Sequence, residues 1–139
     1  MAVPAADLFP LFSPEGEKLW VPGWDYEKVT EGAELREGDI FLTRAHDHAA
    51  TEAIWIVKRC DPLTPFVQFY KIEPGDKVGV VTVKCSELAP SRSRVEVTYD
   101  YTALSASGEA FVSTFDEAAY EAFIAEWQRL LTAYFESGH

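Results

Sequence analysis

Two tyrosines in an alternating segment are the first residues of this 139-residue chain that could do chemistry. Tyr99 and Tyr101 stand at every second position with Val95 and Val97, so all four side chains are expected on one face of a strand. A tyrosine hydroxyl can orient a carbonyl or act as a weak acid, and its ordinary pKa is about 10. The alternative is that both are ordinary core tyrosines.

Two basic side chains share a strand face with apolar neighbours. Lys71 has the parity of Phe69, and Arg59 has the parity of Trp55 and Val57. Either side chain could reach into an interior and hold a carboxylate. The competing interpretation is a solvent-facing or snorkelling side chain, and a strand bulge would reverse either parity.

The segment His46-Asp47-His48 offers two imidazoles and a carboxylate, which are metal-ligand types. Near-adjacent residues in a hairpin tip seldom close a metal site alone. The sequence places no cysteine and no third histidine close by. We therefore expect a solvated turn here and no metal.

Nucleophilic catalysis has weak support. Ser105 and Ser107 lie in a predicted small-residue loop without the elbow motif of hydrolases. Cys60 and Cys85 lie in or beside apolar strands and form no metal-binding spacing, so we expect reduced, inert thiols. The chain has no glycine-rich nucleotide-binding motif, and we expect no cofactor.

The elements that must position these residues are mainly strands. β-Branched and aromatic runs predict five strands, over residues 39–44, 51–59, 66–73, 77–87 and 94–104, with a short irregular strand over 24–29. The connections are short and rich in turn-forming residues, which favours antiparallel hairpins. Alternation in the last strand indicates a sheet with one covered face and one wet face.

Helices are expected at both ends of the chain. Two short helices are predicted in the first twenty residues, the second with Ser13 as its N-cap. A long helix is predicted over 115–137, with Thr114 as N-cap and Glu117 completing a capping box. Its apolar stripe makes it the only large element able to cover the sheet, which predicts an α+β fold.

The chain is rich in large aromatic side chains, with 4 Trp, 6 Tyr and 9 Phe. Such rings fill a core, line a cavity or form an interface. We expect a subset to line a ligand cavity between the sheet and the last helix: Trp20, Trp24, Phe41, Trp55, Phe69, Tyr99, Tyr101, Phe123 and Trp127. The alternative is a filled core.

The formal charge of −11 argues against nucleic acid and anionic membranes as partners, because both attract Lys and Arg. The acidic residues of the first forty positions favour solubility over a basic protein partner. No segment is long and apolar enough to cross a membrane, and the first residues do not resemble a signal peptide. We expect one cytoplasmic domain over residues 1–139.

The order of elements and several local motifs resemble the START-like, or SRPBCC, superfamily and its polyketide cyclase/dehydrase-like group of small bacterial proteins. The most specific segments are FPLFSPEGE (residues 9–17) and LWVPGW (19–24). Weaker matches are Phe41, Thr43, Trp55, Asp61-Pro62, Val97-Thr98-Tyr99, the segment 102–105, Gly108 and the helix with Trp127.

The resemblance implies a helix-grip fold, in which a curved antiparallel sheet wraps around a long C-terminal helix and leaves a deep cavity. That fold usually begins with a full strand, whereas here only residues 1–3 are available, so we expect a vestigial strand. A homodimer across the resulting sheet edge is an open alternative.

The resemblance also implies a function class. We expect a module that binds a small apolar or aromatic molecule, similar to a lipid or polyketide. The alternatives are a cyclase/dehydratase-type enzyme on such a ligand and a protein-interaction domain like the activators of heat-shock chaperone ATPases. The fold alone does not choose among them.

Overall fold

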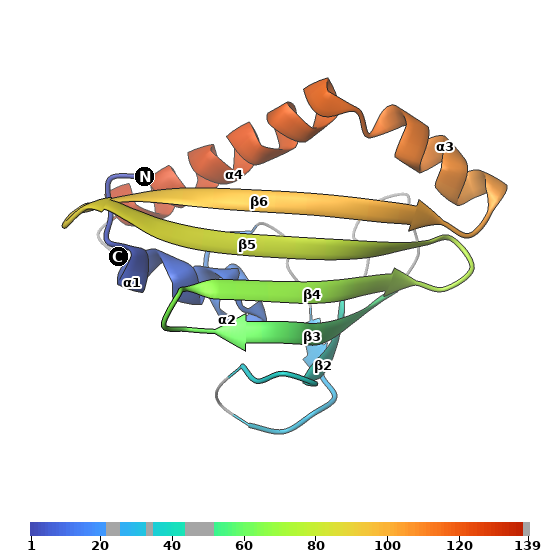
Figure 1. The fold of residues 1–139 in the computed structure, drawn as a ribbon, viewed down its shortest axis with the longest axis horizontal. Coiled ribbons are helices and arrows are strands. Elements are labelled where there is room, and N and C mark those ends of the chain that lie inside the picture. Colours follow the sequence, from blue (N-terminus) through green and yellow to red (C-terminus); the bar gives the residue numbers. More distant parts are fainter. Residues whose placement is uncertain (22–25, 33–34, 44–51, 138–139) are drawn as a thin grey trace.

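An antiparallel sheet with helices on one side forms the molecule (Figure 1). The computed structural model describes residues 1–21, 26–32, 35–43 and 52–137. Within these ranges the helices are α1 (Ala5–Leu8), the 3-10 helix η1 (Phe9–Phe12), α2 (Pro14–Glu17), α3 (Ala106–Thr114) and α4 (Glu117–Glu136). The strands are β1 (Tyr26–Lys28), β2 (Ile40–Thr43), β3 (Ala53–Asp61), β4 (Phe66–Glu73), β5 (Lys77–Ala89) and β6 (Arg92–Ala103).

The strands follow one another in sequence order, and every neighbouring pair is antiparallel. This meander confirms the strands predicted from β-branched and aromatic runs, with ends shifted by a few residues. Its register places one row of residues side by side across the sheet: Phe41, Trp55, Lys71, Gly79 and Tyr101. We call the face that carries this row the inner face.

Alternation separates the inner face from the outer face. On β5 and β6, inner-face residues such as Val81, Val83 and Val97 are buried, while their sequence neighbours are more exposed. The predicted common face of Val95, Val97, Tyr99 and Tyr101 is therefore confirmed. One side of each strand faces the core and the other faces outward.

The short N-terminal helices pack on the inner face near one end of the sheet (Figure 1). Leu8, Leu11 and Phe12 are buried there. The indole Nε1 of Trp20 donates a hydrogen bond to the carbonyl oxygen of Leu11 at 2.8 Å. Ser13 caps α2 as predicted, because its hydroxyl accepts a hydrogen bond from the amide of Gly16 at 3.0 Å.

Residues 1–3 run beside the start of β6 without forming a strand. The Met1 nitrogen donates to the Ser93 carbonyl oxygen at 2.8 Å, and the Ser93 amide donates back to the Met1 carbonyl oxygen at 2.9 Å. The Ser93 hydroxyl also donates to the Val3 carbonyl oxygen. This segment therefore covers the β6 edge at Ser93.

The predicted single helix over 115–137 is wrong at its start. Residues 106–114 form a separate helix, α3, in place of the predicted loop around Ser105 and Ser107. The chain leaves helical geometry at Phe115 (φ −85°, ψ 64°). Asp116, not Thr114, caps α4, because its carboxylate accepts a hydrogen bond from the Ala119 amide at 2.9 Å.

Contacts in the first turn of α3 explain why this segment is helical. The Ser105 hydroxyl accepts a hydrogen bond from the Gly108 amide at 3.1 Å, which caps α3. A Cβ at Gly108 would lie 1.9 Å from the Asp76 carbonyl oxygen, so only glycine allows α3 to touch the turn between β4 and β5. This contact holds the start of α3 against the sheet.

The long helix α4 runs alongside β6 (Figure 1). Leu131 is the only buried residue of α4, although Ile124, Trp127 and Leu130 also pack against the core. The Tyr120 hydroxyl donates a hydrogen bond to the Val97 carbonyl oxygen. The helix is thus attached at a few points and leaves room between itself and the sheet.

Candidate functional site

The inner face carries one compact group of rings on β2, β3 and β4. Phe41 stacks on Trp55 with their centroids 5.6 Å apart, and Phe69 meets both rings edge to face at 6.0 Å and 5.8 Å. All three side chains are buried. These rings form an ordinary packed core at this end of the sheet.

A second group of rings lies where β6 faces α3 and α4. Trp127 is at its centre, with its centroid 5.9 Å from Phe12, 5.5 Å from Trp20 and 6.3 Å from Tyr99. The group continues along β6 and the helices through Tyr101, Phe111, Phe115 and Phe123. We call this set of eight residues the ring cluster.

Rings of the ring cluster retain accessible surface. Phe111 and Phe123 are 37% and 39% exposed, and Tyr99, Tyr101 and Trp127 are half-buried. A filled core would bury such rings, as it does around Phe69. The ring cluster is therefore buried at Phe12 and Trp20 and reaches the accessible surface at Phe111 and Phe123.

The structure divides eight of the nine predicted lining residues between the two groups. Phe41, Trp55 and Phe69 belong to the packed group, and Trp20, Tyr99, Tyr101, Phe123 and Trp127 belong to the ring cluster. Trp24 lies outside the described residues. Sequence reasoning did not select Phe12, Phe111 and Phe115, although the segment that holds Phe12 carried the family resemblance.

A pocket of about 280 Å³ opens between the start of β6 and α4. Its lining is mostly apolar: Met1, Phe12, Leu88, Ser93, Arg94, Val95, Val97, Ile124, Trp127, Gln128 and Leu131. Its size approaches that of sites for small organic molecules. Of the predicted lining residues that the structure describes, Trp127 alone borders this pocket.

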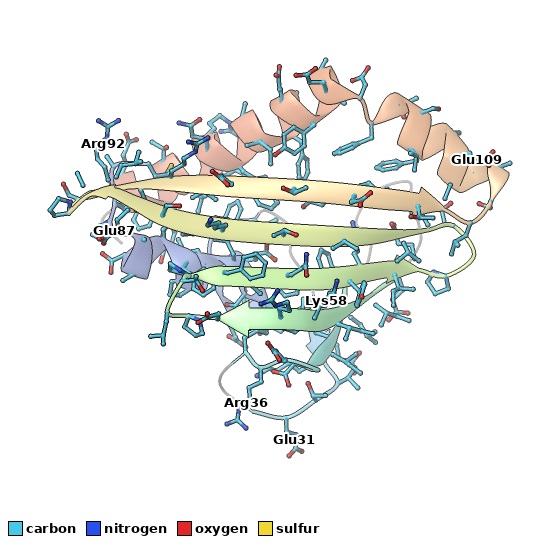
Figure 2. All side chains as sticks on the ribbon, viewed as in Figure 1. Glu31, Arg36, Lys58, Glu87, Arg92 and Glu109 are labelled. Carbon is cyan, nitrogen blue, oxygen red and sulfur yellow. The ribbon has the colours of Figure 1, made fainter. Side chains whose placement is uncertain are left out.

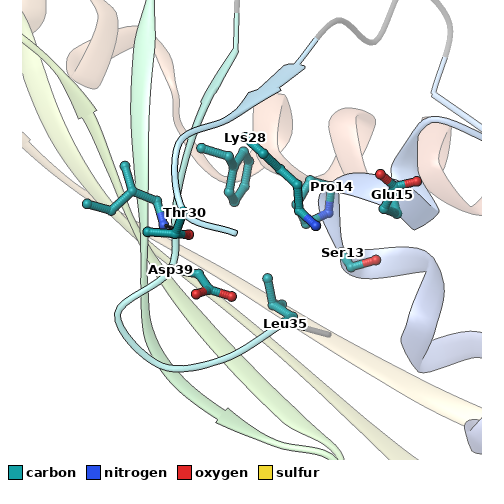
Figure 3. Close-up of a pocket in the computed structure, with 9 residues that line it drawn as sticks. Ser13, Pro14, Glu15, Lys28, Thr30, Leu35 and Asp39 are labelled. Carbon is teal, nitrogen blue, oxygen red and sulfur yellow. Dashed lines mark hydrogen bonds between the residues drawn. The ribbon is translucent and has the colours of Figure 1, made fainter. Parts of the chain in front are cut away.

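A second pocket lies between α2 and the segment that joins β1 to β2 (Figure 3). Glu15, Lys28 and Asp39 give it mixed charge, and Phe41 closes it on the sheet side. Its volume of about 60 Å³ has room for only a few water molecules. It is too small for the expected organic ligand.

Lys71 projects from the centre of the inner face. Its Nζ lies 5.4 Å from the centroid of the Trp55 ring. Burial lowers its pKa below the usual 10.5, and the positive charge of Lys77 acts in the same direction, while Glu73 and Glu17 oppose this shift. Of the two orientations that the sequence left open for Lys71, the structure has the inward one.

The inward alternative for Arg59 is wrong. The register between β3 and β4 shifts between Val57 and Arg59, so Arg59 pairs with the outward Gln68. Its guanidinium lies over the Phe66 ring at 5.5 Å, and its side chain is exposed. The extra residue of this bulge reverses the parity that the sequence indicated.

Glu17 is a polar inner group that the sequence did not reveal. The sequence assigned it to the first turn of a short helix, where acidic residues favour the helix dipole. In the structure, burial raises its pKa to about 8, and the positive charge of Lys71 partly offsets this shift. The negative charge of Glu17 in turn contributes to the raised pKa of Tyr99.

The hydroxyls of Tyr99 and Tyr101 stay protonated at neutral pH. Burial raises both pKa values above the usual 10, and the nearby acidic groups Glu17 and Glu73 add to the shifts of Tyr99 and Tyr101 respectively. These hydroxyls can donate hydrogen bonds to a ligand, but they are poor bases and poor acids.

A second inner lysine is fully engaged. The Nζ of Lys77 lies 3.0 Å from Glu73 Oε2 and 2.8 Å from Asp76 Oδ2. It also lies 4.0 Å from the centroid of the Phe111 ring. Lys77 therefore joins the turn between β4 and β5 to α3, a role in stability.

The remaining candidate chemistry is not assembled among the described residues. No group of three His, Cys, Asp or Glu there could hold a metal ion, and His46, Asp47 and His48 lie outside the described ranges. Burial raises the pKa of Cys85 to about 11, and burial with nearby carboxylates raises that of Cys60. Neither thiol is an activated nucleophile.

Comparisons with known proteins do not identify the chain. No family model matches it, and a search of curated proteins finds no match. Within the described residues, no helix has the length and apolar character needed to cross a membrane.

Proposed function

We propose that this chain binds a small hydrophobic or aromatic molecule between the sheet and α4. The observation that carries the proposal is the pocket of about 280 Å³ between β6 and α4, next to the half-exposed rings of the ring cluster. Apolar walls with a few polar groups are typical of small-molecule sites. The burial of ligand surface against Trp127 and its neighbours would supply the binding free energy.

The architecture supports the same proposal. A curved antiparallel meander, two short N-terminal helix regions and a long C-terminal helix are compatible with the helix-grip fold of the START-like superfamily. In that fold the ligand lies between the sheet and the last helix. The pocket between β6 and α4 supports binding of a ligand in this part of the molecule.

Glu17 favours one alternative, an enzyme of cyclase/dehydratase type. A carboxyl group with a pKa of about 8 can exchange protons near neutral pH, as a general acid or base must. In this alternative Glu17 would move a proton to or from a ligand held by the ring cluster. Turnover of a bound apolar substrate that is lost in Glu17→Gln would favour the enzyme over the binding module.

The binding proposal is tested with N-phenyl-1-naphthylamine, an uncharged aromatic probe whose fluorescence rises in apolar surroundings. We expect saturable binding of one probe per chain. Trp127→Ala should weaken the affinity by about ten-fold, because one large ring contact is worth about 1.5 kcal/mol. Ile124→Ala, a milder change in the pocket wall, should weaken it less.

The matched control is Tyr70→Ala. Tyr70 is a half-buried ring on the outer face of β4, with Lys58 5.2 Å from its centroid. We expect this variant to bind the probe as the original protein does. Absence of saturable binding, or an equal loss in Tyr70→Ala and Trp127→Ala, would contradict the proposal.

A further inference from the structure

We propose that two copies of this chain associate through the outer faces of their sheets, as a dimer with two-fold symmetry. The observation that carries the proposal is a set of eight apolar side chains on the outer face, arranged in two adjacent rows across β2 to β5. The rows are Leu42, Ile54, Ile72 and Val78, and beside them Ile40, Ile56, Tyr70 and Val80. We call this set the outer patch.

The outer patch departs from the pattern of a sheet that faces solvent. A half-covered antiparallel sheet has polar side chains on its open face, and β6 follows this rule with Thr98, Asp100 and Thr102. In contrast, residues 53–57 of β3 (AIWIV) are apolar on both faces of the sheet. Such runs are typical of strands that are covered on both sides.

No helix among the described residues covers the outer patch. The helices pack on the inner face (Figure 1), where they contribute to the core and the ring cluster. Each side chain of the outer patch is only half-buried, although most of them lie on the central strands β3, β4 and β5. A contiguous apolar patch of this kind is typical of a surface that binds another protein.

The outer patch is complementary to itself. Its two rows have four residues each, so a two-fold axis that runs between the rows and across the strands would exchange them. On β3 this axis places Ile54 of one copy against Ile56 of the other, and on β5 it places Val78 against Val80. Two sheets that pack face to face in this way lie about 10 Å apart, with strand directions within about 30° of each other.

Charged residues on the two sides of the outer patch support the same arrangement. Glu52 immediately precedes β3 and Lys58 lies in its second half, and both side chains are exposed. The Nζ of Lys58 lies 5.2 Å from the centroid of the Tyr70 ring, so its positive charge borders the outer patch (Figure 2). Each residue is three positions from Trp55, where the proposed axis crosses β3. Glu52 of each copy would therefore face Lys58 of the other, which gives two pairs of opposite charge.

Sedimentation velocity from about 1 µM to about 500 µM chain tests the proposal, because this range includes the dissociation constants of weak protein complexes. Salt is kept at about 0.15 M, where the repulsion between two chains of net charge −11 is largely screened. We expect a reversible equilibrium between monomer and dimer with no larger species, because a two-fold interface closes on itself.

Ile56→Lys and Ala122→Lys form a matched pair. Each adds one positive charge, but Ile56 lies in the outer patch whereas Ala122 is exposed on α4. We expect Ile56→Lys to weaken the dimer by at least about 100-fold, because it buries an unpaired charge twice in each dimer. Ala122→Lys should change the dissociation constant by no more than about two-fold.

A milder variant keeps the test valid if Ile56→Lys does not fold. Ile72→Thr retains a β-branched residue, which suits a strand, and removes part of the apolar contact. We expect it to weaken the dimer by about ten-fold, since the change also occurs twice in each dimer.

Exchanging the two charges tests the orientation of the copies. Lys58→Glu places a carboxylate opposite each Glu52, and Glu52→Lys places an ammonium group opposite each Lys58. We expect each single variant to weaken the dimer by about five-fold. Glu52→Lys is the more decisive, because it lowers the net negative charge and general repulsion alone would strengthen the dimer. The double variant keeps the net charge of −11 and should restore the dissociation constant to within about two-fold.

Three results would overturn the inference. The first is a chain that stays monomeric throughout the concentration range, in which case a different protein would be the partner of the outer patch. The second is a dimer that Ile56→Lys and Ala122→Lys affect equally, which would place the interface elsewhere. The third is a double charge variant that associates as weakly as the single variants. None of these results bears on the proposed function, because its pocket lies between β6 and α4.

Discussion

Glu17 and Lys71 differ in how far their places could be inferred from the sequence. For Lys71 the regular alternation of β4 indicates the same face as Phe69, but the sequence left open whether its side chain turns inward or reaches the solvent. Glu17 lies on a helix of four residues, where periodicity gives no orientation. The inward alternative for Arg59 is wrong for a different reason. A bulge between Val57 and Arg59 reverses the side-chain parity, and no residue type in the sequence marks that bulge.

The raised pKa of Glu17 predicts how stability changes with pH. Between the unfolded value of 4.5 and the folded value of about 8, the native state holds a proton that the unfolded state has released. The free energy of unfolding therefore falls as the pH rises through this range. Glu17→Gln should remove this fall and raise stability near pH 8 by about 2–4 kcal/mol, since each pKa unit corresponds to ~1.4 kcal/mol.

Urea unfolding at several pH values measures this effect. Glu121→Gln serves as the exposed control and should leave the pH profile in place. A profile for Glu17→Gln that coincides with that of the original protein would contradict the burial of the Glu17 carboxyl group.

The close approach of the Tyr101 ring to Gly79 gives a second prediction for single residues. Gly79→Ala should destabilise the protein by about 1–3 kcal/mol, because its Cβ would meet the Tyr101 ring at 2.8 Å. The penalty should vanish in a Tyr101→Ala background, where the ring is absent. An equal penalty in both backgrounds, measured by urea unfolding, would mean that the contact is not the cause.

At the scale of elements, the sequence predicts helices better than it predicts where they begin. Thr114 and Asp116 are both favoured N-cap residues. The residues that follow either of them could form the first turn of a helix. In the structure Asp116 is the N-cap, because the Phe115 ring packs against Tyr99 and Tyr101. The distances between ring centroids are 6.1 Å and 5.6 Å. A tertiary contact of this kind has no local signature.

The cap assignment can be tested directly. Asp116→Ala should lower stability by about 1 kcal/mol, because it leaves the Ala119 amide without its acceptor. Thr114→Ala should cost less, since the Thr114 hydroxyl only donates to the Phe111 carbonyl oxygen at the end of α3. The reverse order in urea unfolding would indicate that α4 begins at Thr114.

At the scale of the whole molecule, the meander and its two faces could be predicted, whereas the open space could not. Alternating strands joined by short turns are compatible with few sheet topologies. The long amphipathic helix packs its apolar side on one face of that sheet. Whether the rings meet or stand apart depends on how closely α4 approaches β6. The sequence therefore predicted several of the rings on the inner side of the molecule, but not Phe12, Phe111 and Phe115. It also gave no sign that Phe69 is packed while Phe123 is 39% exposed.

The central claim is that an apolar molecule binds between the sheet and α4, and nuclear Overhauser effects from bound N-phenyl-1-naphthylamine test it most directly. We expect contacts from the probe to protons of Trp127, Tyr99 and Ile124. Tyr70, on the outer face of the same sheet, is the internal control and should show none. Contacts to Tyr70 without contacts to Trp127 and Tyr99 would contradict binding between the sheet and α4.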